Sequence, residues 1–443
     1  MKFNLDSAIM EGAFTFCKDF GGNILPYEFT GPRDEFMATR TTASLGVFLN
    51  SSPIYDISGK DAEKFLNKVC VNRDFNLMKP GGSRHGLICN DKGQLLASGV
   101  ILKKENGDYR TYWLAPAIQY FLMTSGLDVK GEYLNDEYFY QLDGPKSLEI
   151  LEEATETDLH DLKFGQNKKV KICGTDMIVY RLGMTGALAY EVHGAAKNAE
   201  MAYKKLREVL FKYGGKLQGA RNYVQIQHTP AGYPNQFQHF WYPFQSSGVG
   251  LAEFAEKIGG LNAPFAGSAS DNNENFYSTP YDLGWEKLIS FDKDDFIGKE
   301  ALMEIAQKPS RTMVTLEWNA DDVADVFASQ FRGTDVEPYE QIEHISGLSD
   351  ASQGAAIRGD YVLVDDQKIG VATGKTYSFY EQRMISLASI DQKYAKEGTV
   401  VVVLWGSPGT PQKKIRAKVA RFPYFNAEFR NETFDVKKIP RRK

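Results

Sequence analysis

The spacing of apolar residues changes near Arg311, and this change divides the chain into two parts. Before it, stretches that alternate like strands, such as 53–58 and 136–143, are followed by stretches with helical spacing, 61–69 and 146–154. After it come short strand-like stretches separated by turns, at 311–318, 360–366, 368–374, 384–390, 399–405 and 413–422. The sequence therefore predicts an α+β protein, with α/β layers over residues 1–310 and an all-β, barrel-like domain over 311–443.

Further elements are predicted within the first part. A hairpin over 86–102 turns at Asp91-Lys92-Gly93, and a helix over 198–215 ends at two glycines. Further strands are expected at 110–115, 176–182 and 189–193. Residues 228–280 are rich in Pro, Gly, Gln, Asn and aromatic residues and have weak periodicity. We expect them to form a partly irregular insertion of the kind that often carries specificity.

The composition is that of a globular protein with a large core. Of its 443 residues 42% are hydrophobic and 25% are charged, and the net charge is −5. This acidic balance argues against nucleic acid as the main partner, because phosphate binding needs a basic face. The cysteines form no CxxC pair, so Cys17, Cys70, Cys89 and Cys173 are expected to be buried and reduced. No signal-peptide pattern and no apolar stretch long enough to span a membrane occur, which predicts a cytoplasmic protein.

The common catalytic motifs are absent from the sequence. It has no GxxxxGK[ST] loop, no GxSxG elbow and no convincing GxGxxG after a strand. None of its six histidines sits in an HExxH or HxxxH pair, so no metal site is expected. Longer, ordered patterns must therefore carry the functional prediction.

A series of short motifs runs through the chain in a fixed order. It comprises 59–66 (GKDAEKFL), 72–74 (NRD), 79–81 (KPG), 90–93 (NDKG), 141–145 (QLDGP), 181–186 (RLGMTG), 190–191 (YE), 280–285 (PYDLGW), 295–302 (DFIGKEAL), 369–370 (IG) and 373–378 (TGKTYS). In order and spacing the series resembles the glycine-cleavage T-protein (aminomethyltransferase) family over roughly residues 30–425. The resemblance implies a three-domain cloverleaf with a central folate channel, made of two interleaved folate-binding α/β domains within 1–310 and the barrel-like domain of 311–443.

Within that family the chain most resembles the tetrahydrofolate-dependent O-demethylases that act on vanillate and syringate. The similar stretches lie in both parts of the chain, at 181–194, 277–285, 291–302, 314–331, 376–391 and 399–406. The implied reaction moves a methyl group from a methoxylated aromatic compound to N5 of tetrahydrofolate, giving a phenol and 5-methyltetrahydrofolate. Two alternatives stay open: a folate-dependent transferase with a sulfonium or amine substrate, and a folate-binding protein without catalysis.

The resemblance places Glu191 against the pterin ring. A pterin presents an amine and a ring N–H side by side, and a buried carboxylate can accept both hydrogen bonds. The alternative is a solvent-exposed Glu at the end of a strand. Met184, Arg221 and Tyr233 are also predicted to contact the cofactor; Tyr233 would stack on it, and its alternative is simple packing.

Tyr223 and Asp74 are the predicted catalytic residues. The demethylases have a tyrosine at the position of Tyr223, close to the methoxy oxygen, where a leaving phenoxide needs a proton. The pKa of an ordinary tyrosine resembles that of a simple phenol, so sharing a proton would cost little. Asp74 corresponds to an aspartate near the reacting folate nitrogen in T-proteins. The alternatives are a core tyrosine and a capping aspartate.

The predicted methyl-donor pocket departs from the demethylases that it resembles. Leu114 replaces an arginine that holds the substrate carboxylate, and Leu25 replaces a tyrosine. Ser51 and Ser52 stand where those enzymes have a histidine. A leucine cannot pair with a buried carboxylate, so we expect a substrate less acidic than vanillate, or an acid group bound elsewhere. The candidates for binding it elsewhere are Arg33, Arg84 and His228.

Overall fold

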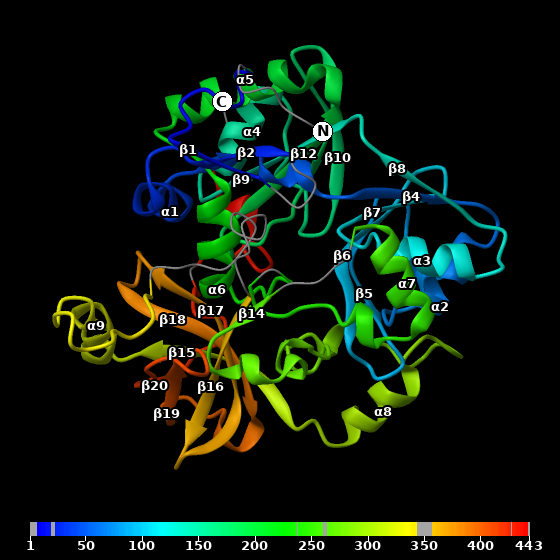
Figure 1. The fold of residues 1–443 in the computed structure, drawn as a ribbon. Coiled ribbons are helices and arrows are strands. Elements are labelled where there is room, and N and C mark those ends of the chain that lie inside the picture. Colours follow the sequence, from blue (N-terminus) through cyan, green and yellow to red (C-terminus); the bar gives the residue numbers. More distant parts are fainter. Residues whose placement is uncertain are drawn as a thin grey trace.

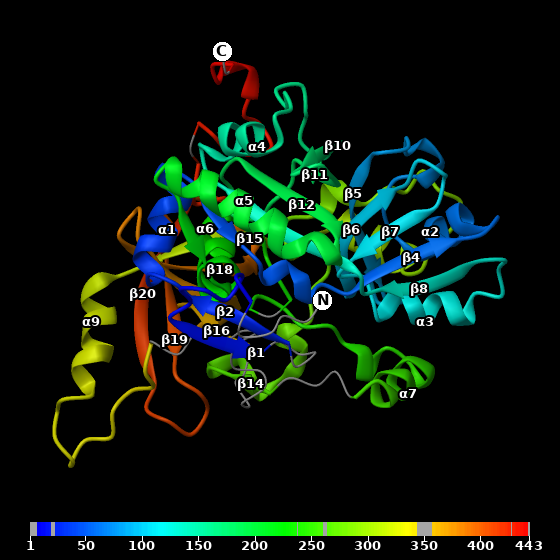
Figure 2. The same cartoon turned by 90° about the horizontal axis from the view of Figure 1, so that it is seen from above.

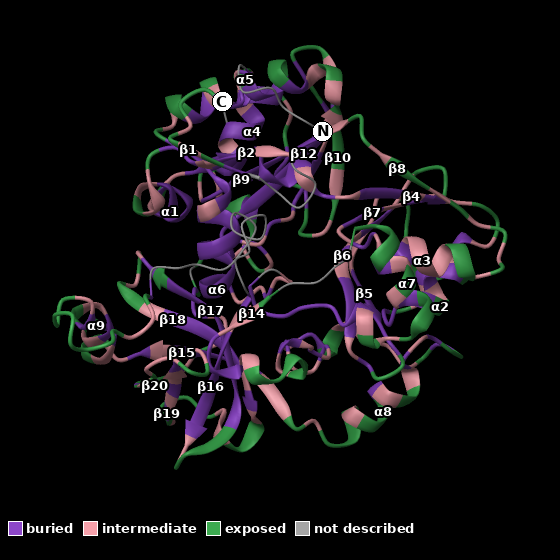
Figure 3. Ribbon diagram, in the orientation of Figure 1, coloured by how far each residue is buried: buried purple, intermediate pink, exposed green. Residues whose placement is uncertain are grey.

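A computed structural model describes residues 7–18, 23–236, 238–259, 264–342, 357–426 and 428–441. Most of the strands form three sheets of six, five and seven strands, and a two-stranded ribbon lies near the N-terminus. Figures 1 and 2 show three bodies, each built on one of these sheets and grouped around a common centre. In Figure 3 the strands are mostly buried and the exposed residues lie on outer helices and loops. The chain is therefore α+β, as predicted.

The first body is the six-stranded sheet with its helices. Its strands, in spatial order, are β10 (Asn167–Ile172), β11 (Thr175–Tyr180), β12 (Ala189–Ala195), β9 (Glu137–Asp143), β3 (Ser44–Gly46) and β13 (Lys216–Gln218). Helices α4 (Ser147–Thr155) and α5 (Ala199–Lys212) pack against it in one apolar core. The apolar residues of α5 recur at helical spacing and are buried, and Gly214, with φ 72°, ends the helix as predicted.

The second body is the five-stranded sheet. Its strands are β5 (Ser83–Cys89), β6 (Leu95–Lys103), β7 (Tyr109–Tyr112), β4 (Ile54–Ser58) and β8 (Lys130–Leu134). Its core also takes residues from α2 (Ala62–Val69), α3 (Ala117–Thr124), α7 (Val249–Lys257) and α8 (Lys299–Gln307). Helix α2 buries Ala62, Phe65, Leu66 and Val69, the residues whose spacing predicted it. The predicted hairpin is confirmed as β5 and β6.

The third body is a closed β-barrel. Its strands run in the order β16 (Ile357–Val364), β17 (Gln367–Ser378), β18 (Arg383–Asp391), β15 (Arg311–Trp318), β20 (Lys413–Ala420) and β19 (Val400–Trp405). Strand β19 also pairs with β16, and this pairing closes the sheet on itself. All six strands arise from the stretches that the sequence predicted, because alternating residues fill the barrel core. Helix α9 (Ala320–Ser329) follows β15.

Two segments cross the predicted boundary at residues 310 and 311. The short strand β14 (Phe265–Ala266) lies in the first part of the chain but pairs with β16 of the barrel. The C-terminal segment returns to the first body, where Arg181 donates hydrogen bonds to the carbonyls of Asn431 and Phe434 at 2.9 and 2.5 Å. The division of the chain into domains stays a prediction.

Short and irregular elements connect the bodies. They are β1 (Thr15–Lys18), β2 (Ile24–Glu28), α1 (Pro32–Thr41), α6 (His228–Ala231), the π-helical turn η4 (Arg221–Gln227) and the 3₁₀ turns η1 (Phe48–Ser51), η2 (Phe75–Leu77), η3 (Ala196–Asn198), η5 (Phe244–Ser246), η6 (Ser268–Asp271), η7 (Asn273–Phe276), η8 (Glu286–Leu288), η9 (Gln392–Tyr394) and η10 (Val436–Lys438). Within the described part of 228–280 the chain is mostly irregular, as predicted, apart from α6, α7 and β14.

The structure corrects one expectation about the cysteines. Cys17, Cys70 and Cys89 are buried, but Cys173 is exposed. Cys173 and Gly174 form the two-residue turn between β10 and β11, with φ of 48° and 79°. A hairpin turn of this kind projects from the sheet edge, so its residues face solvent. Among the described helices none is long and apolar enough to cross a membrane, and the cytoplasmic location stays a prediction.

Candidate functional site

Glu191 lies in the middle of β12, between β9 and β11. Its cross-strand neighbours are Gln141 on β9 and Tyr180 on β11, so these side chains share one face of the sheet. The carboxyl group is buried and makes no hydrogen bond within the described residues, and its Oε2 lies 3.7 Å from His193 Nε2. Burial, helped by the charge of Asp143, raises the pKa of Glu191 to about 8. The interpretation as a solvent-exposed glutamate is therefore wrong.

A buried polar network lies beside Glu191. The amide nitrogen of Gln141 donates to Asp143 Oδ1 at 3.0 Å, while its Oε1 is buried and has no hydrogen-bond partner. Asp143 also accepts from Thr185 Oγ1 at 3.1 Å and from Gln218 Nε2 at 2.6 Å. Because buried acceptors are normally satisfied, Gln141 Oε1 and the Glu191 carboxyl mark a place where a ligand with hydrogen-bond donors can bind.

Tyr223 lies on the π-helical turn η4 and is almost fully buried. Its ring stacks on Phe48 with centroids 4.1 Å apart and meets the edge of His228 at 5.3 Å. Its hydroxyl oxygen accepts a hydrogen bond of 3.3 Å from the backbone N–H of Met184. Burial, together with the charges of Asp143 and Glu191, raises the pKa of Tyr223 well above its usual value.

This pKa corrects the expectation that Tyr223 resembles a simple phenol. The hydroxyl keeps its proton, so Tyr223 can donate a hydrogen bond to an oxygen that gains negative charge, but it does not supply a phenolate. Met184, which donates to the Tyr223 hydroxyl, follows Gly183, and the backbone of Gly183 lies against Gln141 and Asp143, so Tyr223 lies beside the polar network that adjoins Glu191.

An apolar cluster encloses one side of Tyr223. Its other members are Cys17, Leu25, Phe48, Leu49, Ile54, Tyr112, Phe139, Ala220 and Val224, with Tyr27, Val100, Trp113, Leu134 and Met184 packed against them. Leu25 is fully buried here, as a pocket residue should be. Ser51 Oγ donates to the carbonyl of Phe48 at 2.9 Å, whereas Ser52 Oγ is buried without a partner. The structure thus brings Leu25 into one cluster with Tyr223, and the places of Ser51 and Ser52 in the pocket stay predictions.

Leu114 does not belong to this cluster. It is fully buried in the core of the second body, where its side chain lies close to Gly86 and Ile101. The preceding residue, Trp113, packs against the cluster instead. Strand β7 ends at Tyr112 rather than at the predicted residue 115, and Trp113 has φ 66°, which reverses the alternation of side chains. This placement does not favour the prediction that Leu114 lines the donor pocket, which stays a prediction.

The three candidates for binding a substrate acid group lie in different places. Arg33 is exposed on α1. Arg84 donates to the backbone carbonyls of Arg73 and Asp74, and its guanidinium lies over the ring of Phe75. Only His228 contacts Tyr223.

His228 is neutral, and its tautomer follows from one contact. Its Nδ1 lies 2.9 Å from the carbonyl oxygen of Tyr233, and a carbonyl can only accept, so Nδ1 carries the proton. Burial lowers the pKa of His228 to about 3. Its Nε2 is therefore an acceptor rather than a positive charge that could pair with a carboxylate.

Asp74 caps the 3₁₀ turn η2. Its Oδ1 accepts from the backbone N–H of Asn76 at 2.8 Å and from Asn67 Nδ2 at 2.7 Å, and these bonds lower its pKa. The capping interpretation is thus confirmed. The catalytic role of Asp74 stays a prediction that these contacts do not favour.

Arg221 and Tyr223 lie on opposite sides of η4, because two residues span nearly half a turn of a π-helix. Arg221 forms an ion pair of 2.6 Å with Glu28 and lines a separate cavity of about 180 Å³ beside Lys375, Thr376 and Phe379. Its predicted contact with the cofactor finds no support in this placement.

Tyr233 follows Gly232, which ends α6 with φ 73° and packs against Pro423. Its hydroxyl is buried without a partner, and the guanidinium of Arg430 lies 5.4 Å from the centre of its ring. A free buried hydroxyl agrees with a role in ligand binding, which stays a prediction.

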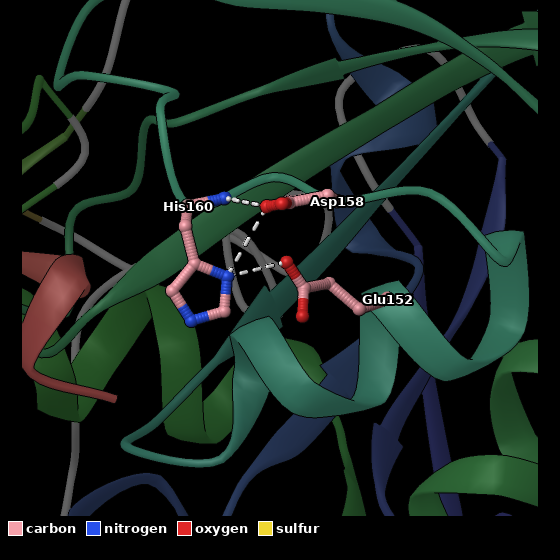
Figure 4. A group of neighbouring side chains, drawn as sticks. All are labelled: Glu152, Asp158 and His160. Atoms are coloured by element: carbon pink, nitrogen blue, oxygen red, sulfur yellow. Dashed lines mark hydrogen bonds and ion pairs between the residues drawn. The ribbon is translucent and has the colours of Figure 1, made fainter. Parts of the chain in front are cut away.

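Within the described residues one group of side chains has the composition of a metal site: Glu152, Asp158 and His160. Figure 4 shows that these side chains converge, but both ring nitrogens of His160 already have protein partners. Nδ1 lies 2.8 Å from Glu152 Oε1, and Nε2 lies 2.9 Å from the carbonyl oxygen of Ile439. The group therefore fastens the C-terminal segment to the first body, and we assign it no metal.

Sequence reasoning missed several residues of the site. Gln141 and Asp143 lie within a quoted motif, but nothing in the sequence shows that their side chains form a network beside Glu191. His193 had a usable signal, because residues two apart on a strand share a face. Phe48 and Trp113 had none, since each lies where the chain leaves regular structure.

Comparison with known proteins supports one family. The GCVT N-terminal domain model matches residues 9–228. Sesamin methylene transferase of Sinomonas sp. strain No.22 is 46% identical over 98% of this chain and 97% of its own, and syringate O-demethylase of Sphingobium sp. strain SYK-6 is 30% identical over 90% of each. An aminomethyltransferase of Caldanaerobacter subterraneus subsp. tengcongensis is 26% identical over 87% of each.

The fold agrees with these sequence relationships. The crystal structure of the glycine cleavage system aminomethyltransferase T from Bartonella henselae superposes with a TM-score of 0.67, covering 95% of this chain and 96% of that one at 18% identity. This likeness confirms the predicted aminomethyltransferase-type fold with its C-terminal barrel. The resemblance inferred from the ordered motifs is confirmed as well, and the chain belongs to the GCVT, or aminomethyltransferase, family.

Proposed function

We propose that this protein is a tetrahydrofolate-dependent enzyme that removes a methyl group from a methoxylated aromatic compound and transfers it to N5 of tetrahydrofolate. The products are a phenol and 5-methyltetrahydrofolate. One observation carries the proposal: a buried, unbonded carboxyl at Glu191 lies in the same site as a buried, protonated phenol at Tyr223. The names of two relatives, syringate O-demethylase and sesamin methylene transferase, agree with an aromatic ether as donor.

The residues present suit a pterin. Its amine and adjacent ring N–H are donors, and Glu191 and Gln141 Oε1 are buried acceptors with no hydrogen-bond donor from the described protein. Tyr233, whose backbone carbonyl accepts from His228, has a buried hydroxyl without a partner as well. Donors and acceptors therefore complement each other, which is what fixes the orientation of a bound ring.

The protein's own groups perform the remaining tasks. When bound, tetrahydrofolate supplies the N5 nucleophile that receives the one-carbon unit. Tyr223 donates a hydrogen bond to the ether oxygen as negative charge develops on it, and burial makes this bond stronger than it would be in water. Phe48, Leu25 and Trp113 form the apolar wall that holds the aromatic ring and excludes water.

A second candidate donor is a methylenedioxy ring, in which one carbon bridges two aromatic oxygens. The relative at 46% identity is named sesamin methylene transferase, and the wall beside Tyr223 includes apolar Leu25 and Trp113, which suit a donor without an acid group. Transfer of the bridging carbon would give a catechol and 5,10-methylenetetrahydrofolate. The one-carbon product thus distinguishes the two donors.

The test is an anaerobic assay of the purified protein with tetrahydrofolate and a panel of donors: vanillate, syringate, guaiacol, sesamin and dimethylsulfoniopropionate. Folate products are identified by mass spectrometry. We expect 5-methyltetrahydrofolate from guaiacol faster than from vanillate. Rapid turnover of vanillate would contradict a donor pocket without a carboxylate-binding arginine.

The same panel covers the alternatives. Turnover of dimethylsulfoniopropionate alone would replace the aromatic donor by a sulfonium. Tight folate binding without turnover of any donor would favour a non-catalytic folate-binding protein.

A further inference from the structure

His193 lies two residues after Glu191 on β12 and faces the same side of the sheet. It is 1% exposed. Three aromatic rings surround its imidazole: Phe139 at 4.0 Å, Tyr180 at 4.5 Å and Tyr112 at 5.1 Å between centroids. A phenylalanine would pack well among these rings. The presence of two buried polar nitrogens at this position therefore needs an explanation.

The two nitrogens have different surroundings. Nδ1 lies 3.1 Å from the hydroxyl oxygen of Tyr112. Nε2 is buried without a hydrogen-bond partner, and the group facing it is the Glu191 carboxyl, whose Oε2 is 3.7 Å away. A small movement of either side chain would bring these two atoms within hydrogen-bond distance.

The tautomer of His193 depends on the direction of its contact with Tyr112. Arg110, which can only donate, and the hydroxyl of Tyr180 both interact with the Tyr112 hydroxyl. The proton of Tyr112 can go to Tyr180 or to His193 Nδ1, and in the second arrangement the imidazole proton is on Nε2. We assign the tautomer with the proton on Nε2. In this tautomer the Nε2–H of His193 points toward the Glu191 carboxyl.

We propose that His193 is a positioning residue that donates from Nε2 to the Glu191 carboxylate once this group is ionised, as pterin binding requires, with Arg110 and Tyr112 of β7 holding it in this orientation. The inference rests on the proposed function, because it assumes that Glu191 accepts the pterin's donors. It adds a second body of the protein to the folate site, since β7 belongs to the five-stranded sheet and Glu191 to the six-stranded one.

The physical need for such a donor is clear. A carboxylate accepts two pterin hydrogen bonds only when it is ionised, and burial opposes ionisation. A donor that uses a lone pair not needed by the ligand offsets part of this cost. Arg110 is anchored for this purpose, with hydrogen bonds of 2.7 and 2.8 Å to Asp56 and of 2.7 Å to Glu137.

Other titratable groups surround the pair and set the background for any pH effect. They are Arg110 and Tyr112 on β7, Glu137 and Asp143 on β9, Tyr180 on β11 and Tyr223 on η4. Glu137 Oε1 lies 3.8 Å from His193 Nδ1, and Glu137 and His193 both line an open groove of about 900 Å³.

The experiment measures tetrahydrofolate affinity from pH 6 to 9.5 for the wild type, His193→Phe and His193→Gln. Binding requires ionised Glu191, whose pKa in the empty site is about 8, so wild-type affinity should rise with pH, with its midpoint near 8, and level off about one unit above it. His193→Phe keeps the packing and removes the donor. We expect roughly tenfold to hundredfold weaker binding at pH 7 and a midpoint about one to two pH units higher.

His193→Gln places an amide N–H near the position of Nε2 and should restore most of the affinity and the wild-type midpoint. A merely structural role would lower the melting temperature without moving the midpoint. An unchanged midpoint in His193→Phe, or a loss that His193→Gln does not reverse, would overturn the proposal. If His193→Phe does not fold, Tyr112→Phe serves in its place, with a smaller shift in the same direction expected.

The test of His193 can fail without contradicting the proposed function, and the two failures can be told apart. A wild type that does not bind tetrahydrofolate contradicts both. A wild type that binds and turns over an aromatic ether, with His193→Phe indistinguishable from it, contradicts only the role of His193.

Discussion

The two sides of the proposed site are built from different kinds of structure. Glu191, Gln141 and His193 lie on adjacent antiparallel strands, so the hydrogen-bond ladder fixes their relative positions. On the other side, Tyr223 lies on a π-helical turn and Phe48 on a 3₁₀ turn, and Trp113 has a left-handed backbone. A residue on an irregular segment can be exchanged without disturbing a sheet. This difference is compatible with the names of two relatives, which refer to different compounds, syringate and sesamin.

Burial acts on both sides in the same direction. It raises the pKa of Glu191 to about 8 and that of Tyr223 well above its usual value, so both groups are protonated near neutral pH in the empty protein. Their tasks differ, however. Glu191 must lose its proton to bind a pterin, whereas Tyr223 must keep its proton to assist a leaving oxygen. The four changes below are designed to affect one side and not the other.

The largest effect is expected from Tyr223→Phe, which removes the hydroxyl that faces the leaving oxygen. We expect a loss of roughly 10²–10³-fold in kcat, as for the removal of one donor from an oxyanion site, with tetrahydrofolate affinity unchanged. Single-turnover assays and direct folate binding measure the two quantities. Tyr203→Phe is the matched control, because Tyr203 is fully buried on α5 with an unpartnered hydroxyl away from the site. Equal loss of affinity and rate in Tyr223→Phe would break the division into two sides.

Glu191→Gln should act on the folate side. Replacing a carboxylate that accepts two hydrogen bonds costs about 1.5–3 kcal/mol, or roughly tenfold to more than hundredfold in affinity above pH 8. The rise of affinity with pH should also disappear, because the raised pKa of Glu191 is its source. Calorimetric titration between pH 6 and 9.5 measures both. A variant that keeps the wild-type pH profile would show that another group releases the proton.

Trp113→Gly and Trp113→Ala test the donor wall. Both remove the indole, so the KM for the aromatic donor should rise about tenfold while folate affinity stays the same. They differ in stability, because φ 66° suits glycine but costs alanine roughly 1–2 kcal/mol. Steady-state kinetics and urea unfolding give the two results. Equal stability of the two variants would mean that Trp113 leaves the left-handed conformation when its ring is removed.

The smallest effect on activity is expected from Asp74→Ala. The loss of the cap on η2 should cost about 1 kcal/mol of stability, and kcat should change less than twofold. Asp74→Asn, which can still cap the turn, is the control. A large loss of kcat in both variants, with folding intact, would restore the catalytic role predicted for Asp74.

The regular elements were predictable because their residues alternate or recur at helical spacing along the chain. All six barrel strands, α2 and α5 follow from such patterns. Two predictions that the structure does not favour have local causes. Leu114 lies in another apolar core because a single left-handed residue, Trp113, changes which side chain faces the cluster. Arg221, predicted to contact the cofactor, is only two residues from Tyr223, but the π-helical turn puts the two on opposite sides.

The sequence by itself determined the family, the barrel and the position of Glu191 on a strand, because these depend on ordered motifs and on local periodicity. Only the tertiary structure decided the chemical state of the site. Whether Glu191 is exposed or buried, whether Tyr223 resembles a phenol, and whether Nε2 of His193 finds a partner all depend on neighbours from distant segments. Desolvation and charge act through space between such segments, so a pattern of adjacent residues cannot report them.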